Sequence, residues 1–170
     1  MLKSVLLQAV LAGGSEMQRF MNTDYTTCNK EGINNLVTEA DHASEKAIMD
    51  LIKKSFPGHY ILSEESGEIV QDSTYKWIID PIDGTINFSR GIPICCVSIG
   101  IEQEGKMILG AVYNPFMNEI YFAERGQGAT LNERSICVSK KQKIKLKATR
   151  INFPPKYIFY ITFGKCSIAK

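Results

Sequence analysis

The segment KWIIDPIDGTINF, residues 76–88, decides how the centre of this chain folds. Its apolar run, residues 77–79, predicts a buried strand. Asp80 is expected at the end of that strand, where the backbone leaves the core for solvent. Pro81 has no amide hydrogen, so we expect it to halt the hydrogen-bond ladder directly after Asp80.

A second aspartate and a turn follow within the same segment. Asp83 comes three positions after Asp80 and can turn back beside it. Gly84 permits a positive φ, and Thr85 can open a helix whose first amide hydrogens face an anion. Two carboxylates and an anion-binding turn therefore lie close together in the sequence. Taken alone, an Asp-Pro-Ile-Asp-Gly run is also a common turn whose aspartates bind their own backbone.

Helical patterns come first in the chain and strand patterns follow. Apolar residues from Leu2 to Phe20 have helical spacing, and a second helix is predicted from about Asp41 to Phe56. Apolar blocks of strand length then occur at residues 60–62, 77–79, 94–101, 107–113 and 119–123. Helices followed by several close strands indicate an α+β fold in which helices and a sheet form layers.

Charge is unevenly distributed over the 170 residues. Residues 1–139 hold 11 basic and 18 acidic side chains, a balance of 11 − 18 = −7, whereas residues 140–170 hold nine basic side chains and no acidic one. We therefore divide the chain into residues 1–139 and a basic, divergent tail, residues 140–170. The tail suits RNA or an anionic membrane surface. We favour the alternative interpretation, an abrupt departure from the fold as in a shortened or frame-shifted product.

Cysteine and histidine usage argues against several kinds of site. The five cysteines are odd in number and have no Cys-x-x-Cys spacing, which predicts neither a disulfide framework nor structural zinc. Reduced thiols fit a cytoplasmic protein. The chain has only two histidines, so a histidine-based metal site is not expected. Gln8 interrupts the first apolar run, which predicts a soluble helix and neither a signal peptide nor a membrane span.

An ordered set of motifs resembles the inositol monophosphatase family, which comprises magnesium-dependent, lithium-sensitive phosphatases. The motifs are Lys30, LVTEAD at 36–41, SEESG at 63–67, DPIDGTINF at 80–88, VSIG at 97–100, GQGA at 126–129 and Leu131-Asn132. A chance match of the whole ordered set is improbable. The resemblance implies the layered helix and sheet sandwich of inositol monophosphatases and fructose bisphosphatases. It also implies Mg²⁺-dependent hydrolysis of a small phosphate monoester.

The resemblance also implies which residues bind the metal. Glu64, Asp80, the main-chain carbonyl of Ile82 and Asp83 match the family's ligands, with Asp80 bridging two ions. Hard carboxylate oxygens without thiolate or imidazole suit Mg²⁺ on chemical grounds as well. Lys30 and Glu65 match weaker positions near the metals. For Glu65, a solvated acidic loop is an equally good interpretation.

Further residues are implied to act on water and phosphate. Glu64 would orient the attacking water, and Thr85 would help to activate it beside Asp41. The amides of Gly84 and Thr85 could bind the phosphate. Two structural alternatives stay open: Thr38 and Asp41 have capping-box spacing, and Thr85 could be a helix N-cap.

The resemblance covers only an N-terminal portion of the family. The family's second half supplies a further metal aspartate from a Trp-Asp pair, whereas this chain has one tryptophan, Trp77, and no acidic residue after Glu133. We therefore expect a truncated fold of the family type. Residues 85–88, TINF, favour a myo-inositol monophosphate as substrate, and family members usually form homodimers. The alternative is an inactive fragment, or a scaffold that binds a partner or RNA.

Overall fold

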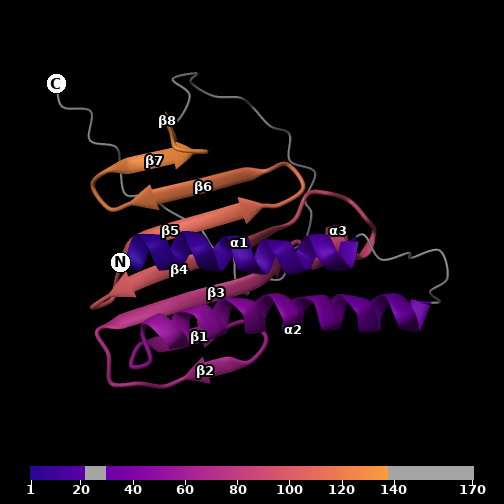
Figure 1. The fold of residues 1–170 in the computed structure, drawn as a ribbon, viewed down its shortest axis with the longest axis horizontal. Helices are drawn as coiled ribbons and strands as arrows, with labels where there is room; N and C mark the ends of the chain where they lie inside the picture. Colours follow the sequence, from indigo (N-terminus) through magenta and orange to yellow (C-terminus); the bar gives the residue numbers. More distant parts are fainter. Residues whose placement is uncertain (22–29, 138–170) are drawn as a thin grey trace, which may run out of the picture.

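A computed structural model describes residues 1–21 and 30–137, with side chains described from residue 39 in the second range. Three helices and eight strands form the described part (Figure 1). The helices are α1 (Leu2–Met21), α2 (Lys30–Ser55) and the short α3 (Thr85–Ser89). The strands are β1 (Tyr60–Ser63), β2 (Gly67–Ile69), β3 (Tyr75–Asp83), β4 (Cys96–Gln103), β5 (Lys106–Asn114), β6 (Glu119–Glu124), β7 (Gly128–Leu131) and β8 (Arg134–Ile136). The tail, residues 140–170, lies outside the described residues.

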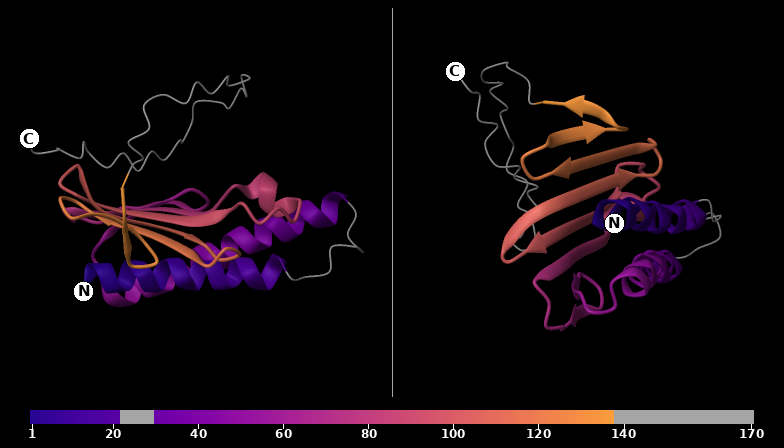
Figure 2. Two further views of the ribbon diagram at one scale, coloured as in Figure 1. Left: turned by 90° about the horizontal axis from the view of Figure 1, so that it is seen from above. Right: turned by 60° about the vertical axis from the view of Figure 1, so that its left-hand side comes forward.

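All the described strands belong to one mixed sheet in the order β2-β1-β3-β4-β5-β6-β7-β8. β1 and β3 are parallel, and the neighbouring pairs from β3 to β8 are antiparallel. Helices α1 and α2 lie side by side against one face of this sheet (Figure 2). Helices layered on a mixed sheet confirm the predicted α+β class.

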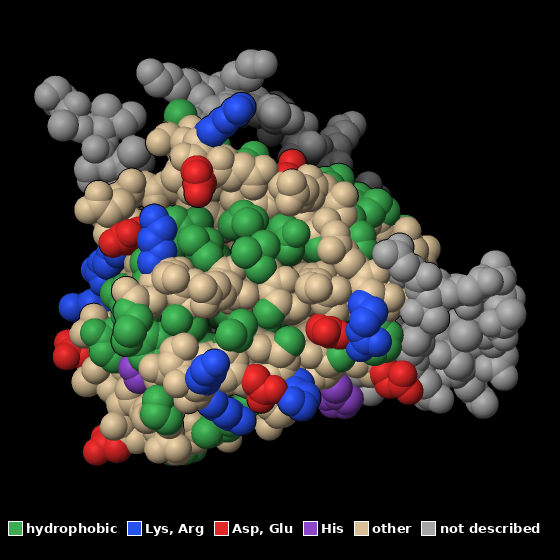
Figure 3. All heavy atoms as spheres, viewed as in Figure 1, with side chains coloured by type: hydrophobic (Ala, Val, Ile, Leu, Met, Phe, Trp, Pro, Cys, Tyr) green, Lys and Arg blue, Asp and Glu red, His purple; other side chains and the backbone are tan. Residues whose placement is uncertain are grey.

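Helix α1 packs closely because two glycines lie on its buried side. Leu6, Val10 and Met17 are fully buried, as their helical spacing predicted. A Cβ atom added at Gly14 would lie 2.5 Å from ring carbons of Tyr113 on β5. Gly13 similarly faces the α2 side chain of Ile48. The outer side of the two helices carries interspersed acidic and basic side chains, as solvated helix faces do (Figure 3).

The predicted start of the second helix was wrong. Helix α2 begins at Lys30, so Asp41 lies eleven residues (41 − 30) inside it and cannot serve a capping box with Thr38. The helical spacing of Ile33, Leu36 and Ala40 continues the pattern upstream, and it outweighs the weak helix propensity of the intervening asparagines. Neither long helix in the described ranges has the apolar content needed to cross a bilayer.

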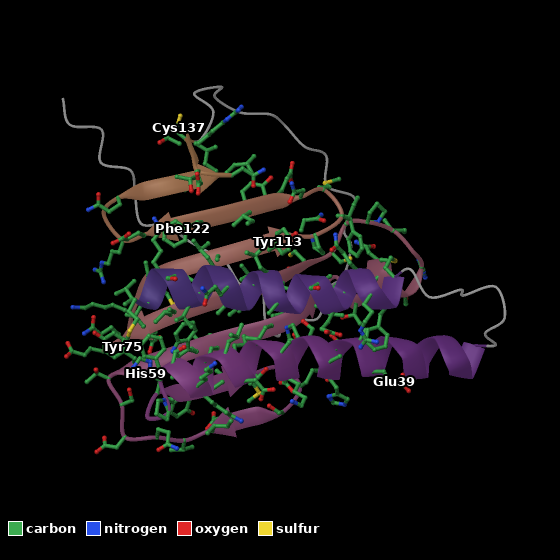
Figure 4. The ribbon with its side chains drawn as sticks, in the orientation of Figure 1. Glu39, His59, Tyr75, Tyr113, Phe122 and Cys137 are labelled. Atoms are coloured by element: carbon green, nitrogen blue, oxygen red, sulfur yellow. The ribbon has the colours of Figure 1, made fainter. Side chains whose placement is uncertain are left out.

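An aromatic cluster packs at the end of the sheet that is opposite α3. The His59 ring stacks between Phe56 and Tyr75, with centroid distances of 4.6 and 4.9 Å (Figure 4). Trp77 is fully buried and donates a hydrogen bond from Nε1 to His59 Nδ1 at 3.0 Å. His59 is therefore part of the packing at this end, and Nδ1 is its acceptor atom.

Candidate functional site

A bulge in β3 sets the directions of Asp80 and Asp83. Asp80 pairs with Ser98 and Asp83 pairs with Cys96, so three steps on β3 oppose two steps on β4. Side chains alternate along a strand, and two residues three apart would normally point to opposite faces. The extra residue at the bulge brings both aspartates onto one face. The hydrogen-bond ladder between β3 and β4 was expected to stop at Pro81, but it is only interrupted there and resumes at Asp83. Pro81 has no amide hydrogen, and it lies within the bulge, where no ladder bond is needed.

The turn after β3 has the predicted conformation. Gly84 has φ 91° and ψ 36°, in the left-handed region, and α3 begins at Thr85. The N-cap residue of α3 is Gly84, which forms no side-chain capping hydrogen bond. The interpretation of Thr85 as the N-cap was therefore wrong. The Thr85 hydroxyl instead donates to the carbonyl oxygen of Ile82 at 3.1 Å. Two of the predicted site atoms are therefore in direct contact.

The turn between β1 and β2 carries Glu64 and Glu65 to the same edge of the sheet. Because β1 runs parallel to β3, their carboxyl ends lie together. The amide of Glu64 donates to the carbonyl of Ile79 at 3.1 Å, which ties the turn to β3 just before Asp80. Both glutamates are exposed, whereas Asp80 retains only 7% of its accessible surface.

Helix α2 adds three buried polar residues, Asp41, Ser44 and Glu45. Their i, i+3 and i+4 spacing puts them on one helical face. Ser44 Oγ donates to the carbonyl of Pro81 at 3.0 Å, and Glu45 Oε1 accepts from the amide of Ser66 at 3.0 Å. The sequence prediction missed Ser44 and Glu45, although their spacing from Asp41 was a usable signal.

Burial and mutual repulsion raise the pKa values of two carboxyls. The pKa of Asp80 rises to about 8, first because of desolvation and then because Glu64 and Asp83 lie near it. The pKa of Asp41 rises to about 7, again mainly by desolvation, with Glu65 and Glu64 as the nearby charges. The predicted residues Asp41, Glu64, Glu65, Asp80 and Asp83 are thus one electrostatically coupled cluster.

The donor atoms of this cluster are carboxylate oxygens, the type of ligand that a hard divalent cation prefers. In the arrangement described, no group of three or more His, Cys, Asp or Glu side chains in residues 1–21 and 39–137 is positioned to hold a metal ion. However, Asp80 Oδ1 is buried and has no hydrogen-bond partner among these residues. An unpaired buried carboxylate oxygen beside further carboxylates is an unfavourable arrangement that a cation would relieve. Lys30 begins α2, but its side chain is not among those described.

The thiols near Asp83 are neutral at ordinary pH. Burial, and then the Asp83 carboxylate, raises the pKa of Cys95 to about 11 and that of Cys96 to about 12. Cys96 Sγ lies 3.9 Å from Asp83 Oδ2. A neutral thiol is a poor nucleophile, so these cysteines do not supply one.

Comparison with known proteins identifies a matching family and several similar proteins. The model of the inositol monophosphatase family matches residues 2–156. Nus factor SuhB of Haemophilus influenzae is 40% identical over 157 residues, which are 92% of this chain and 59% of that protein. Inositol-1-monophosphatase of Synechocystis is 43% identical over 136 residues, which are 79% of this chain and 47% of that protein.

A solved structure agrees with the fold. The crystal structure of extragenic suppressor protein suhB from Bartonella henselae matches with a TM-score of 0.74 and 38% identity. The match covers 82% of this chain and 55% of that one. The chain therefore spans about half to three fifths of the length of these relatives.

Proposed function

This chain belongs to the inositol monophosphatase family, and we propose that its acidic cluster hydrolyses a small phosphate monoester with Mg²⁺. The observation that carries the proposal is the buried, unpaired oxygen of Asp80 among the carboxylates of Glu64, Asp83 and Asp41. Such a cluster is costly unless a cation or protons neutralise it. If these groups bind Mg²⁺, relief of their repulsion would contribute to the binding free energy of the metal.

The residues that would hold Mg²⁺ are Glu64, Asp80, the carbonyl of Ile82 and Asp83. When bound, Mg²⁺ would lower the pKa of a water molecule and stabilise charge on the phosphate and the leaving alkoxide. Glu65 lies near Asp41 and is an outer contributor, and Lys30 is a further weak candidate. Only oxygen ligands take part, which agrees with the preference of Mg²⁺.

The remaining groups would position the water and the phosphate. Glu64 and Thr85 would align the water. We place Asp41 in support of Thr85 because α2, which carries Asp41, contacts α3. The first amides bonded inside α3 are those of Asn87 and Phe88, which both donate to Gly84 O. The amide of Thr85, at the start of α3, would therefore donate to a phosphate oxygen, and we propose that the amide of Gly84 donates beside it.

We propose myo-inositol 1-phosphate as the substrate. The name of the Synechocystis relative states that activity, and residues 85–88 resemble the inositol branch of the family. We further propose that residues 1–139 carry the activity in a cytoplasmic homodimer, with residues 140–170 as a separate tail. Light scattering of the purified chain measures the dimer directly.

Phosphate release from myo-inositol 1-phosphate tests the function. Mg²⁺ should be titrated, Li⁺ added as an inhibitor, and Asp83→Asn compared with Asp72→Asn, an exposed aspartate outside the cluster. We expect Mg²⁺-dependent release that Li⁺ inhibits and that Asp83→Asn abolishes without changing the melting curve. Equal turnover by Asp83→Asn and Asp72→Asn would eliminate the proposed site.

A second candidate function is binding to RNA or to a transcription partner. It is favoured by the name of the Haemophilus relative, Nus factor SuhB, and by the nine basic residues in 140–170. Contacts between basic side chains and phosphates release counterions, so binding of a fluorescent single-stranded RNA should weaken steeply with salt. RNA binding that is absent, or that does not change between low and high salt, would count against this function.

A further inference from the structure

A pocket of about 700 Å³ lies at the end of the sheet opposite α3. It opens between the first turn of α1, the start of β3 and the ends of β4 and β6, and it includes His59 and Tyr75 (Figure 4). On β3, Tyr75 is five residues (80 − 75) from Asp80, a backbone separation of about 17 Å. We call this hollow the α1 pocket. It is separate from the acidic cluster, and its volume is typical of pockets that bind small molecules.

One wall of the α1 pocket is apolar. Leu2, Phe56, Tyr75 and Ile108 line it, and each is only partly buried against the core. Burial of apolar surface is favourable, so a ligand with an apolar group would gain binding free energy by covering this wall.

The edge of His59 offers a hydrogen-bond donor to this space. Its ring faces are covered by Phe56 and Tyr75. Nδ1 accepts from Trp77 Nε1, so a neutral imidazole carries its proton on Nε2. Burial lowers the pKa of His59, which favours the neutral ring. Nε2 has no hydrogen-bond partner among the described residues and is not one of their buried unpaired atoms, so a ligand can accept from it.

Charged groups of both signs line the α1 pocket. Lys3 and Arg125 supply cations, and Glu124 supplies a half-buried carboxylate. None of the three forms an ion pair with another described residue. Lys3 Nζ lies 4.5 Å from the centroid of the Phe122 ring instead. Because the pocket holds both signs, a ligand with a single charge would meet a like charge, whereas a zwitterion would find an opposite charge for each of its groups.

The sheet register directs the Glu124 carboxylate toward the helices. Glu124 pairs with Leu109, and Leu109 pairs with Ile101. Register partners share a face of the sheet, and both partners of this row are buried in the core under the helices. The carboxylate is therefore on the same face of the sheet as α1, which carries Lys3.

We propose that the α1 pocket binds a free α-amino acid with an apolar side chain. Its ammonium group would pair with Glu124, its carboxylate would accept from Arg125 and His59 Nε2, and its side chain would cover the apolar wall. A free amino acid carries both charges on one carbon, whereas each end of a peptide carries only one of them. The site goes beyond the proposed phosphatase activity and does not depend on it.

Three matched ligands test the proposal by isothermal titration calorimetry of the full chain. L-Phenylalanine carries both charges, 3-phenylpropionate carries only the carboxylate, and 2-phenylethylamine carries only the ammonium group. Mg²⁺ is included to compete with the amine for the acidic cluster. We expect L-phenylalanine to bind roughly fivefold more tightly than either single-charge ligand, because it alone makes both ionic contacts.

Two variants assign the charges. Glu124→Gln should weaken L-phenylalanine about fivefold without weakening 3-phenylpropionate, because it removes a carboxylate that attracts the ammonium group and repels the acid. Arg125→Gln should weaken both of these ligands. The matched control is Glu104→Gln, which removes an exposed carboxylate that does not line the pocket. Melting curves show whether each variant is folded.

The proposal is overturned if the wild type does not bind L-phenylalanine, or if a single-charge ligand binds as tightly. It is also overturned if Glu124→Gln and Glu104→Gln bind L-phenylalanine with affinities within twofold of each other. The assay uses no phosphate ester and no turnover. An inactive chain would therefore leave this test intact, and absent amino-acid binding would leave the phosphatase proposal standing.

Discussion

Replacing Asp80 with asparagine should stabilise the metal-free chain. Burial and neighbouring carboxylates raise the pKa of Asp80 from 3.8 to about 8. A carboxyl whose pKa is raised on folding makes its full contribution to the free energy of unfolding below pH 3.8. That contribution is lost as the pH rises toward 8. At pH 7, which is about three pH units above the pKa of the unfolded chain, the loss of stability is about 1.4 kcal/mol for each unit, or roughly 4 kcal/mol in total. Asparagine does not ionise, so it avoids this loss.

The net gain is smaller because the asparagine amide must also be buried. That burial costs on the order of 2 kcal/mol, which leaves a gain of about 2 kcal/mol at pH 7. At pH 5 the avoided loss is only on the order of 2 kcal/mol, which equals the burial cost, so the gain should vanish. Urea unfolding in EDTA, followed by fluorescence of the fully buried Trp77, measures both values.

Mg²⁺ should reverse the order of stability. The wild type should gain stability from Mg²⁺, and Asp80→Asn should gain little, because ligand binding to the folded state stabilises only the chain that binds. Asp72→Asn is the control for removing one exposed charge. The reasoning is refuted if Asp80→Asn is no more stable than Asp72→Asn in EDTA at pH 7.

Three other substitutions test the fold around the site by urea unfolding. Gly14→Ala should cost about 1–3 kcal/mol despite its better helix propensity, because the new Cβ would meet the Tyr113 ring; an unchanged midpoint would contradict this packing. His59→Phe should cost about 1–3 kcal/mol, because the buried Nε1–H of Trp77 loses its acceptor. Burial lowers the pKa of His59, so the contribution of His59 to folding stability is full above pH 6.5 and falls at lower pH. The variant should therefore lose less stability than the wild type between pH 7 and pH 5. Gly84→Ala should cost about 1–2 kcal/mol through its positive φ, and lower turnover with it, unless the turn relaxes.

Strong periodic patterns made α1 and the centre of β3 predictable from the sequence. Strands β2, β7 and β8 were not predicted, because they have only three or four residues each and depend on pairing with their neighbours. The start of α2 was missed because a plausible cap at Thr38 competed with continuing helical spacing.

The site was predictable in its residues and less so in its geometry. The carboxylates were found through the ordered motifs, but Pro81 indicated a strand end where the structure has a bulge. Ser44 and Glu45 were missed because their partners lie 37 and 21 residues away along the chain. Helical spacing from Asp41 puts both residues on one helical face, but it does not identify Pro81 and Ser66 as their partners, because those contacts depend on tertiary packing.

The same hydrogen bonds explain why the cluster cannot relieve its own repulsion. Its carboxylates come from α2, from the β1–β2 turn and from β3. Ser44 ties α2 to Pro81 in the bulge, Glu45 ties α2 to Ser66, and the amide of Glu64 ties the turn to β3. Moving these segments apart would break these hydrogen bonds, of which the bond from Ser44 to Pro81 is buried and costly to lose. Protonation or a bound cation therefore remains as the route to neutrality, and metal affinity and folding stability become linked through Asp80.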